Sequence, residues 1–262
     1  MSSIDDIFKK PKAKALIAYV TVGYPSLEET ERVVPLLVES GCDIVELGIP
    51  FSDPLADGAT IQQASFYALQ NGITIKHCIE LVKRLRHEIT IPLIFMTYFN
   101  PVFKYGIENF CHDSASVGIN GVIVPDLPPD ESSDLETISR ACGIDLIYLL
   151  APTSTQERIE MVTRRSRGFI YLVSITGTTG AREHLTIDLD ELIAMVKRKT
   201  SKPICVGFGI STPQQAWQVA RLADGIIVGS QIIQLMLTGN DFISVRSFVK
   251  NLRQALDRAG GS

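Results

Sequence analysis

The sequence predicts an α/β protein that forms a single domain over residues 1–262: a (β/α)8 barrel with a helix before its first strand and a closing C-terminal helix. Short apolar runs alternate with amphipathic stretches along the whole chain, and this alternation is typical of parallel strands joined by crossover helices. Eight such runs occur, which favours a closed barrel over an open doubly wound sheet. No Gly/Ser-rich linker or shift in composition divides the chain, and single barrels commonly have this length.

The predicted strands are rich in β-branched and other apolar residues, as expected for strands that are buried on both faces of a parallel sheet. In chain order they cover residues 16–22, 44–49, 91–97, 121–124, 146–150, 169–173, 204–206 and 225–228.

The predicted helices have apolar residues at spacings of three and four, so each has one face that can pack on the sheet. Two segments have the spacing of a capping box, Ser26 with Glu29 and Thr60 with Gln63. The helices cover residues 27–40, 75–88, 107–117, 132–142, 156–166, 189–198 and 213–222, and residues 244–258 form the closing helix.

A glutamate interrupts the second apolar run. Glu46 lies between Val45 and Leu47, and a carboxylate in a buried strand is unfavourable unless it is paired, hydrogen-bonded or neutral. One interpretation is a structural glutamate bonded to the backbone or to an arginine. However, Asp53 and Asp57 follow on a Pro- and Gly-rich loop, at the end of the strand where barrel enzymes carry their catalytic groups. This grouping favours acid–base chemistry.

The loops after the seventh and eighth predicted strands indicate a phosphate site. Gly207 and Gly209 follow one strand, and Gly229 with Ser230 follows the next. Glycines allow backbone N–H groups to approach phosphate oxygens, and a helix N-terminus favours the anion. Tight turns are the alternative interpretation. Tyr171 lies in the sixth strand, and the small-residue loop after it, 174–180, suits a lid.

Composition argues against several classes of protein. The net charge is −4, and no basic run with interleaved aromatic residues suggests nucleic acid as a partner. No apolar stretch has membrane-spanning length, and the first residues do not resemble a secretory signal. The five cysteines include no C-x-x-C pair, so we expect reduced thiols in a cytoplasmic protein. The histidines lack ligand spacing and no lysine lies in a predicted strand, so we expect neither a metal site nor a Schiff base.

The segment from Glu46 to Gly58, with the pattern E-L-G-x-P-F-S-D-P-x-A-D-G, resembles the signature of the tryptophan synthase α subunits. The resemblance extends over nearly the whole chain, and Ala59 stands where the family often has proline. It implies a TIM barrel lyase that cleaves indole-3-glycerol phosphate to indole and glyceraldehyde 3-phosphate. Further matching segments are 18–25, 96–101, 125–128, 151–153, 171–180, 207–211 and 229–230.

The resemblance also implies residue roles. Glu46 would transfer both protons of the retro-aldol reaction, Asp57 would stabilise the indolenine cation, and Tyr171 would position Glu46 or the substrate. Thr179 would swing over the ligand and meet Asp57. The phosphate would contact Gly180, Gly207, Phe208, Gly209, Gly229 and Ser230, and the indole would contact Tyr19, Met96, Ile123, Leu149 and Phe208.

Partners are implied in the same way. A β subunit that carries pyridoxal phosphate would receive the indole, in an α2β2 heterotetramer, while this chain would hold no cofactor itself. Asp53 and Asp126 would take part in communication between the subunits. Two other functions stay open: another phosphate-binding barrel enzyme that acts on a sugar phosphate, and a catalytically weak subunit whose main role is to activate its partner.

Overall fold

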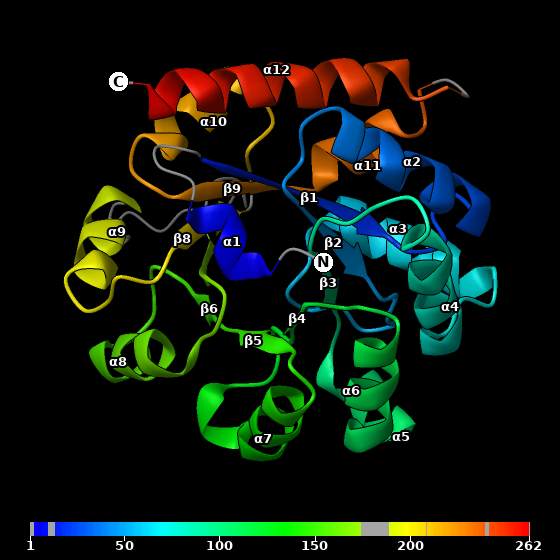
Figure 1. The fold of residues 1–262 in the computed structure, drawn as a ribbon, viewed down its shortest axis with the longest axis horizontal. Coiled ribbons are helices and arrows are strands. Elements are labelled where there is room, and N and C mark those ends of the chain that lie inside the picture. Colours follow the sequence, from blue (N-terminus) through cyan, green and yellow to red (C-terminus); the bar gives the residue numbers. More distant parts are fainter. Residues whose placement is uncertain (1–2, 10–13, 174–188, 208, 239–240, 262) are drawn as a thin grey trace.

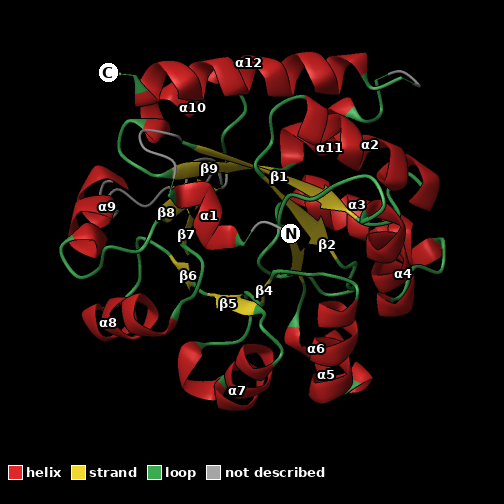
Figure 2. Ribbon diagram, viewed as in Figure 1, coloured by secondary structure: helices red, strands yellow, loops and turns green. Residues whose placement is uncertain are grey.

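The described strands form one parallel sheet that closes into a barrel, with the helices outside it (Figures 1 and 2). The computed structural model describes residues 3–9, 14–173, 189–207, 209–238 and 241–261. The sheet order is β5-β4-β3-β2-β1-β9-β8-β7-β6, and its two end strands are consecutive in the chain. The predicted barrel is therefore confirmed. The strands are β1 (Ala15–Thr21), β2 (Ile44–Gly48), β3 (Leu93–Met96), β4 (Gly121–Ile123), β5 (Asp145–Ile147), β6 (Leu149–Leu150), β7 (Ile170–Val173), β8 (Ile204–Gly207) and β9 (Gly225–Val228).

The helices mostly follow the predicted positions, and both terminal helices are present. The described helices are α1 (Ile4–Phe8), α2 (Leu27–Glu39), α3 (Ala59–Gln70), α4 (Ile75–Leu85), α5 (Phe99–Tyr105), α6 (Ile107–Ser116), α7 (Ser133–Ala141), α8 (Gln156–Arg165), α9 (Leu189–Lys197), α10 (Pro213–Ala220), α11 (Ser230–Leu235) and α12 (Ile243–Gly260), with a 3-10 turn, η1 (Pro129–Glu131), before α7.

The predicted fifth strand, 146–150, is divided in the structure. Tyr148 separates β5 from β6, because its N–H donates to the Ser166 side chain at 3.2 Å instead of joining the sheet. Its carbonyl accepts from Tyr171 N–H at 3.1 Å. Accordingly, β5 pairs with β4 and β6 pairs with β7.

The predicted helices do not include three of the described ones, α3, α5 and α11. The capping box expected at Thr60 and Gln63 is wrong, since α3 begins at Ala59 and its N-cap is Gly58 without a side-chain bond. Proline suits the first position of a helix, so the family's usual proline and Ala59 are both compatible with this start. At the other predicted cap, Ser26 does accept the N–H of Glu29, at 3.1 Å.

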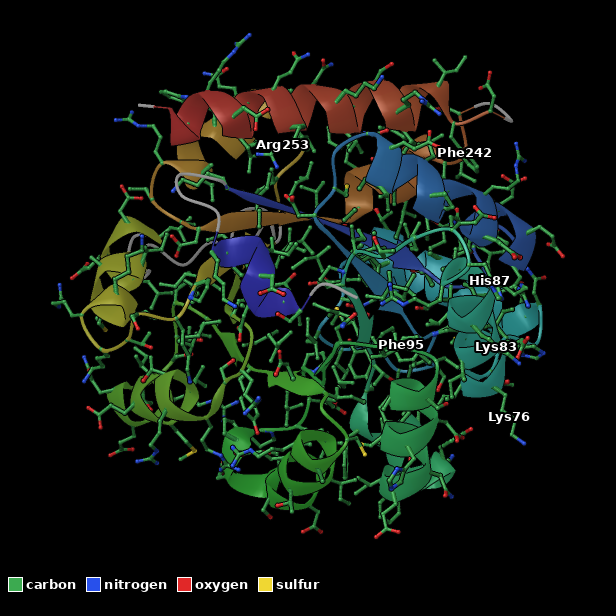
Figure 3. The ribbon with its side chains drawn as sticks, viewed as in Figure 1. Lys76, Lys83, His87, Phe95, Phe242 and Arg253 are labelled. Atoms are coloured by element: carbon green, nitrogen blue, oxygen red, sulfur yellow. The ribbon has the colours of Figure 1, made fainter. Side chains whose placement is uncertain are left out.

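The core consists of two layers separated by the strands. Successive strand residues point to opposite faces, so one set fills the barrel and the other packs under the helices. The outer layer includes Phe95, labelled in Figure 3, whose ring lies 6.2 Å from that of Phe110 on α6. The inner layer contains Ile17, Tyr19, Ile44, Ile94, Met96, Ile123, Ile147, Phe169, Tyr171, Cys205 and Ile227.

The helix α1 forms the floor of the barrel. Ile4 and Ile7 belong to the inner layer, and a Cβ added at Gly121 or Gly168 would lie 3.0 Å from Ile4. Both glycines lie at the N-terminal ends of strands, Gly121 opening β4 and Gly168 preceding β7. Figure 1 shows α1 in front of the ring of strands. The open end of the barrel is therefore the one at which the strands finish.

Hydrogen bonds from Arg253 hold the closing helix α12 at the same end of the barrel as α1. Arg253, labelled in Figure 3, donates to Asp43 at 3.0 Å and to the carbonyl of Lys14 at 2.9 Å. Asp43 and Lys14 directly precede β2 and β1. Among the described helices, none is long and apolar enough to cross a membrane.

We expect Ile4→Ala to lower the free energy of unfolding by about 2–4 kcal/mol, because it leaves a cavity in the closed floor. The side chain is 1% exposed. Urea unfolding of the variant and the parent measures the difference. The matched control is Ile243→Ala, whose side chain is 62% exposed and which should change stability by less than about 0.5 kcal/mol. Equal effects of the two substitutions would contradict the floor assignment.

Candidate active site

Glu46 lies inside the barrel on β2. It pairs in register with Tyr19 on β1 and with Ile94 on β3, and it is fully buried. Neither carboxylate oxygen has a hydrogen-bond partner among the described residues. Burial in this apolar setting disfavours the charge and raises the pKa of Glu46 to about 8. At neutral pH this side chain is therefore predominantly a carboxylic acid that can donate a proton.

Asp57 lies on the loop between β2 and α3. It is half-buried, and its Oδ1 atom is buried without a hydrogen-bond partner in the described part of the chain. Burial raises the pKa of Asp57 to about 6, and an interaction with the Tyr98 hydroxyl opposes this rise. At pH 7 the group is mainly an anion. The barrel thus holds two carboxyl groups whose environments favour opposite protonation states, as in sites that use one acid and one anion.

Tyr171 connects these two groups electrostatically. It lies on β7 and is 4% exposed, and its pKa is held well above its ordinary value by burial and then by the charges of Glu46 and Asp57. Its hydroxyl lies against Gly207, where an added Cβ would overlap it. Glycine at that position therefore makes room for the Tyr171 side chain.

Tyr19, on β1, has surroundings similar to those of Tyr171 and lies beside Glu46 in the sheet. Its hydroxyl shares a hydrogen bond with Thr21 Oγ1 at 3.3 Å, and a Cβ at Gly48 would overlap it. Burial is the main cause of its raised pKa, followed by the charge of Asp57, with Glu46 contributing as well. Two buried tyrosines thus lie within electrostatic reach of both carboxylates.

Further predicted wall residues lie in the same inner layer. Met96 pairs with Ile123 across β3 and β4, and Leu149 pairs with Tyr171 across β6 and β7. Met96 and Ile123 are buried, while Leu149 is partly buried against the same layer. The structure therefore brings these side chains together with Tyr19 and Tyr171 around the barrel interior.

Four of the predicted phosphate residues are described. Gly207 ends β8, and Gly209 has a φ of +83° that favours glycine. Gly229 is the N-cap of α11 and lies beside Tyr19, since a Cβ there would be 3.0 Å from the tyrosine ring. Ser230 is the exposed first residue of α11. Thr179, Gly180 and Phe208 lie outside the described residues, as does the predicted lid.

The two aspartates expected at the subunit contact have different surroundings. Asp126, after β4, accepts the N–H of Phe99 at 2.9 Å and so caps the start of α5. Asp53 is exposed and accepts the hydroxyl of its neighbour Ser52 at 2.5 Å.

Tyr98 is a site residue that the sequence analysis did not single out. Its hydroxyl accepts the N–H of Ala56 at 3.0 Å, and its ring stacks on Phe51 with centroids 5.2 Å apart. The available signal was its place directly after the predicted strand 91–97, at the strand end where barrel sites gather.

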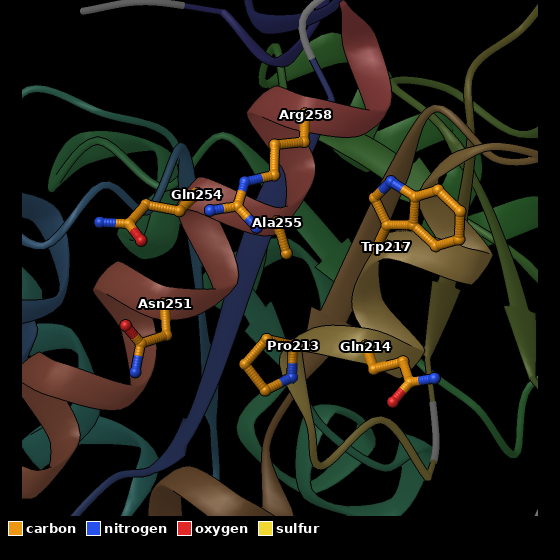
Figure 4. Close-up of a pocket in the computed structure, with 7 residues that line it drawn as sticks. All are labelled: Pro213, Gln214, Trp217, Asn251, Gln254, Ala255 and Arg258. Carbon is orange, nitrogen blue, oxygen red and sulfur yellow. The ribbon is translucent and has the colours of Figure 1, made fainter. Parts of the chain in front are cut away.

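One cavity formed by described residues lies on the outer side of the helices. The cavity in Figure 4, of about 450 Å³, lies between α10 and α12 and is lined by Trp217, Gln254 and Arg258 among others. It lies outside the barrel, away from both carboxylates. Within the described ranges, no cluster of His, Cys, Asp and Glu could hold a metal ion.

Comparison with known proteins gives one consistent result. The family model described as tryptophan synthase alpha chain matches residues 6–256. A relative from Dehalococcoides mccartyi, named tryptophan synthase alpha chain, is 54% identical over 98% of this chain and 100% of its own length. One from Caldanaerobacter subterraneus is 46% identical over the same shares. The crystal structure of tryptophan synthase subunit alpha from Legionella pneumophila has a TM-score of 0.87 at 35% identity, covering 98% of this chain and 99% of that one.

We expect Glu46→Gln to stabilise the protein increasingly as the pH rises from 5 to 8.5. Between the ordinary pKa of 4.5 and the folded value of about 8, the folded state keeps a proton that the unfolded state has released. The stability contributed by the protonated carboxyl is therefore complete below pH 4.5 and lost as the pH rises towards 8. The variant should gain up to about 3–5 kcal/mol over the parent at the upper end.

Guanidinium unfolding at pH 5 and pH 8.5 measures this gain. Glu157→Gln, on an exposed position of α8, is the matched control for the chemical change alone. A stability difference between parent and Glu46→Gln that does not vary with pH would show that Glu46 titrates as an ordinary carboxylate.

Proposed function

The chain belongs to the tryptophan synthase alpha chain family, and from this we propose how its residues perform the family's reaction. It is a carbon–carbon lyase, which cleaves indole-3-glycerol phosphate to indole and glyceraldehyde 3-phosphate. Membership decides between this reaction and the other phosphate-binding barrel activity that the sequence left open. The presence of both carboxyl groups, Glu46 and Asp57, favours this reaction over a catalytically weak subunit whose main role is to activate its partner.

The pair of carboxyl groups carries the proposed mechanism. Glu46, with a pKa of about 8, is protonated at pH 7 and donates to C3 of the indole ring. The side-chain hydroxyl of the substrate then loses its proton to the Glu46 carboxylate, the carbon–carbon bond breaks, and its electron pair returns to the ring. The aldehyde forms from the hydroxyl carbon, and Glu46 ends protonated as it began. One residue thus performs both proton transfers.

Asp57 stabilises the intermediate in this proposal. Protonation at C3 makes the ring an indolenine cation, and an anion beside its N1–H lowers the energy of that state. The pKa of about 6 keeps Asp57 charged at neutral pH. Tyr171, within electrostatic reach of both carboxylates, orients Glu46 or the substrate.

Binding residues follow from the same layout. The inner-layer side chains would enclose the indole ring, and the loops at the ends of β8 and β9 would hold the phosphate through backbone N–H groups. The proposed indole contacts are Tyr19, Met96, Ile123, Leu149 and Phe208, and the proposed phosphate contacts are Gly180, Gly207, Phe208, Gly209, Gly229 and Ser230, with Thr179 closing over the ligand.

A β subunit is the proposed partner. Alpha chains of this family pair with a beta chain, and we expect an α2β2 heterotetramer in which the β subunit holds pyridoxal phosphate and this chain holds no cofactor. Leu55, 92% exposed, lies on the loop after β2 at the open end of the barrel, where the partner would dock. Asp53 and Asp126 are the proposed coupling residues, and the cytoplasm is the expected compartment.

We expect a bell-shaped pH profile of kcat/KM for indole release, with limbs near pH 6 and pH 8. Below pH 6 Asp57 gains a proton and loses its charge, and above pH 8 Glu46 loses the proton that it must donate. Glu46→Gln should reduce turnover by ~10²–10⁴-fold.

Two variants separate the contributions to this profile. The phosphate group of the substrate also titrates near pH 6 and could by itself produce the acid limb. If the acid limb disappears in Asp57→Asn, it belongs to Asp57 and not to the substrate. Tyr171→Phe should reduce turnover less than Asp57→Asn, because a hydrogen bond positions groups and carries no charge. A retained turnover above about a tenth of the parent rate in Glu46→Gln would contradict the mechanism.

We expect saturation with a cognate β subunit to raise turnover by ~5–150-fold, a typical strength of coupling between sites. By the reciprocity of binding free energies, a phosphate ligand bound to this chain should also tighten the complex, by the factor with which the β subunit tightens ligand binding. Titration with the β subunit, following indole release and complex affinity, measures both. Leu55→Ala should weaken the complex, while Ile243→Ala is the exposed control. Unchanged turnover together with ligand-independent affinity would refute the coupling.

A further inference from the structure

The loop that carries Asp57 is held by short-range hydrogen bonds and by Gln62 on α3, which donates to the carbonyls of Pro54 at 3.4 Å and Asp57 at 2.9 Å. Between Phe51 and Gly58 the described hydrogen bonds within the loop are short-range, such as Asp57 N–H to the Pro54 carbonyl at 3.0 Å. Leu55 is almost fully exposed. Such a loop is intrinsically among the least rigid parts of a barrel. An anion that must face a developing charge needs an additional restraint.

Tyr98 makes contacts with three parts of this loop. Its hydroxyl accepts the N–H of Ala56 at 3.0 Å, the residue directly before Asp57. Its ring stacks on Phe51 at 5.2 Å with an interplanar angle of 29°, and its hydroxyl interacts with the Asp57 carboxylate. The tyrosine is 4% exposed, so water competes little for these contacts.

The position of Tyr98 is itself fixed from the far side. It is the N-cap residue of α5, and the next N–H, that of Phe99, donates to Asp126 at 2.9 Å. Asp126 follows β4, Tyr98 follows β3, and Ala56 follows β2. Contacts of Tyr98 and of its neighbour Phe99 therefore link the ends of three neighbouring strands.

We propose that Tyr98 is a positioning residue, which uses its hydroxyl to hold the backbone at Ala56 and the carboxylate of Asp57 in place for the developing cation. The inference rests on the proposed function of Asp57 and extends it to a residue outside the predicted substrate contacts. Tyr98 acts through Asp57 and does not itself transfer a proton. Asp126 supports the same arrangement by fixing the start of α5.

Several titratable groups face this arrangement. Tyr19 on β1 and Tyr171 on β7 respond to the charge of Asp57, and both also respond to Glu46 on β2. Asp126 acts on the Tyr98 hydroxyl. Of these groups, Tyr98 is the one that lowers the pKa of Asp57 by hydrogen bonding. Removal of its hydroxyl should therefore move the Asp57 titration upward.

The test is Tyr98→Phe, which keeps the ring on Phe51 and removes the hydroxyl. We expect kcat at pH 7 to fall roughly 3–10-fold with KM changed less than about twofold, as expected for the loss of one hydrogen bond that acts in the transition state. The acid limb of the pH profile should shift upward by roughly half to one pH unit. Titration of the Asp57 carboxyl by ¹³C NMR, without substrate, should show the same shift.

Tyr105→Phe is the matched control. It makes the same change at the end of α5, where the hydroxyl donates to Asp113 at 2.6 Å. It should alter neither the Asp57 titration nor turnover. Thermal melting of both variants measures any loss of folding, and in the Asp57→Asn background Tyr98→Phe should have no further effect on kcat.

The outcomes distinguish the role of Tyr98 from the role of Asp57. An unmoved Asp57 titration in folded Tyr98→Phe would overturn the positioning role, whatever the turnover. An additional loss of kcat in the Asp57→Asn background would also overturn it, because Tyr98 would then act by another route. A raised titration together with full activity of Asp57→Asn would support the contact and refute the proposed role of Asp57.

Discussion

The burial of one carboxyl group, that of Glu46, is the constraint around which the inner layer of this barrel is organised. A carboxyl group without a described partner remains protonated at neutral pH only if water is kept away from its charged form. Isoleucines of neighbouring strands and the floor at α1 provide that environment. The same burial makes Glu46 a source of instability at high pH, so the acid function proposed for this residue would come at the expense of folding stability.

The second carboxyl group depends on a different kind of support. Asp57 lies on a loop, and its environment comes from strands that are distant in sequence: Tyr19 on β1, Tyr98 after β3 and Tyr171 on β7. Gly48 makes room for the hydroxyl of Tyr19 and Gly207 for that of Tyr171, because a Cβ at either position would overlap the hydroxyl. Small residues in the strands thus allow large polar side chains to converge on the two carboxylates.

Much of this arrangement could be predicted from local sequence patterns, and the parts that could not depend on tertiary contacts. Glu46 stood out because a charge in an apolar run is unfavourable, and the strands stood out by composition. The break at Tyr148 depends on Ser166, 18 residues away. The helix α3 buries Ile61 and Ala64 while Phe66 and Tyr67 are exposed. Its apolar residues therefore do not lie on one face, and the sequence shows no helical periodicity from which α3 could be predicted. Tyr98 resembles any buried aromatic residue until Ala56 and Asp57 are seen beside it.

The floor formed by α1 has a kinetic consequence. A barrel closed at one end gives substrate and both products the same opening, at the ends of the strands. Products must therefore leave by the route through which the next substrate arrives, and each product that lingers blocks entry. A β subunit docked over that opening, as proposed above, would control the exit of products, since it would decide whether indole passes into solution or into a second protein. The short helix at the start of the chain, far from the chemistry, thus sets the direction in which the product is delivered.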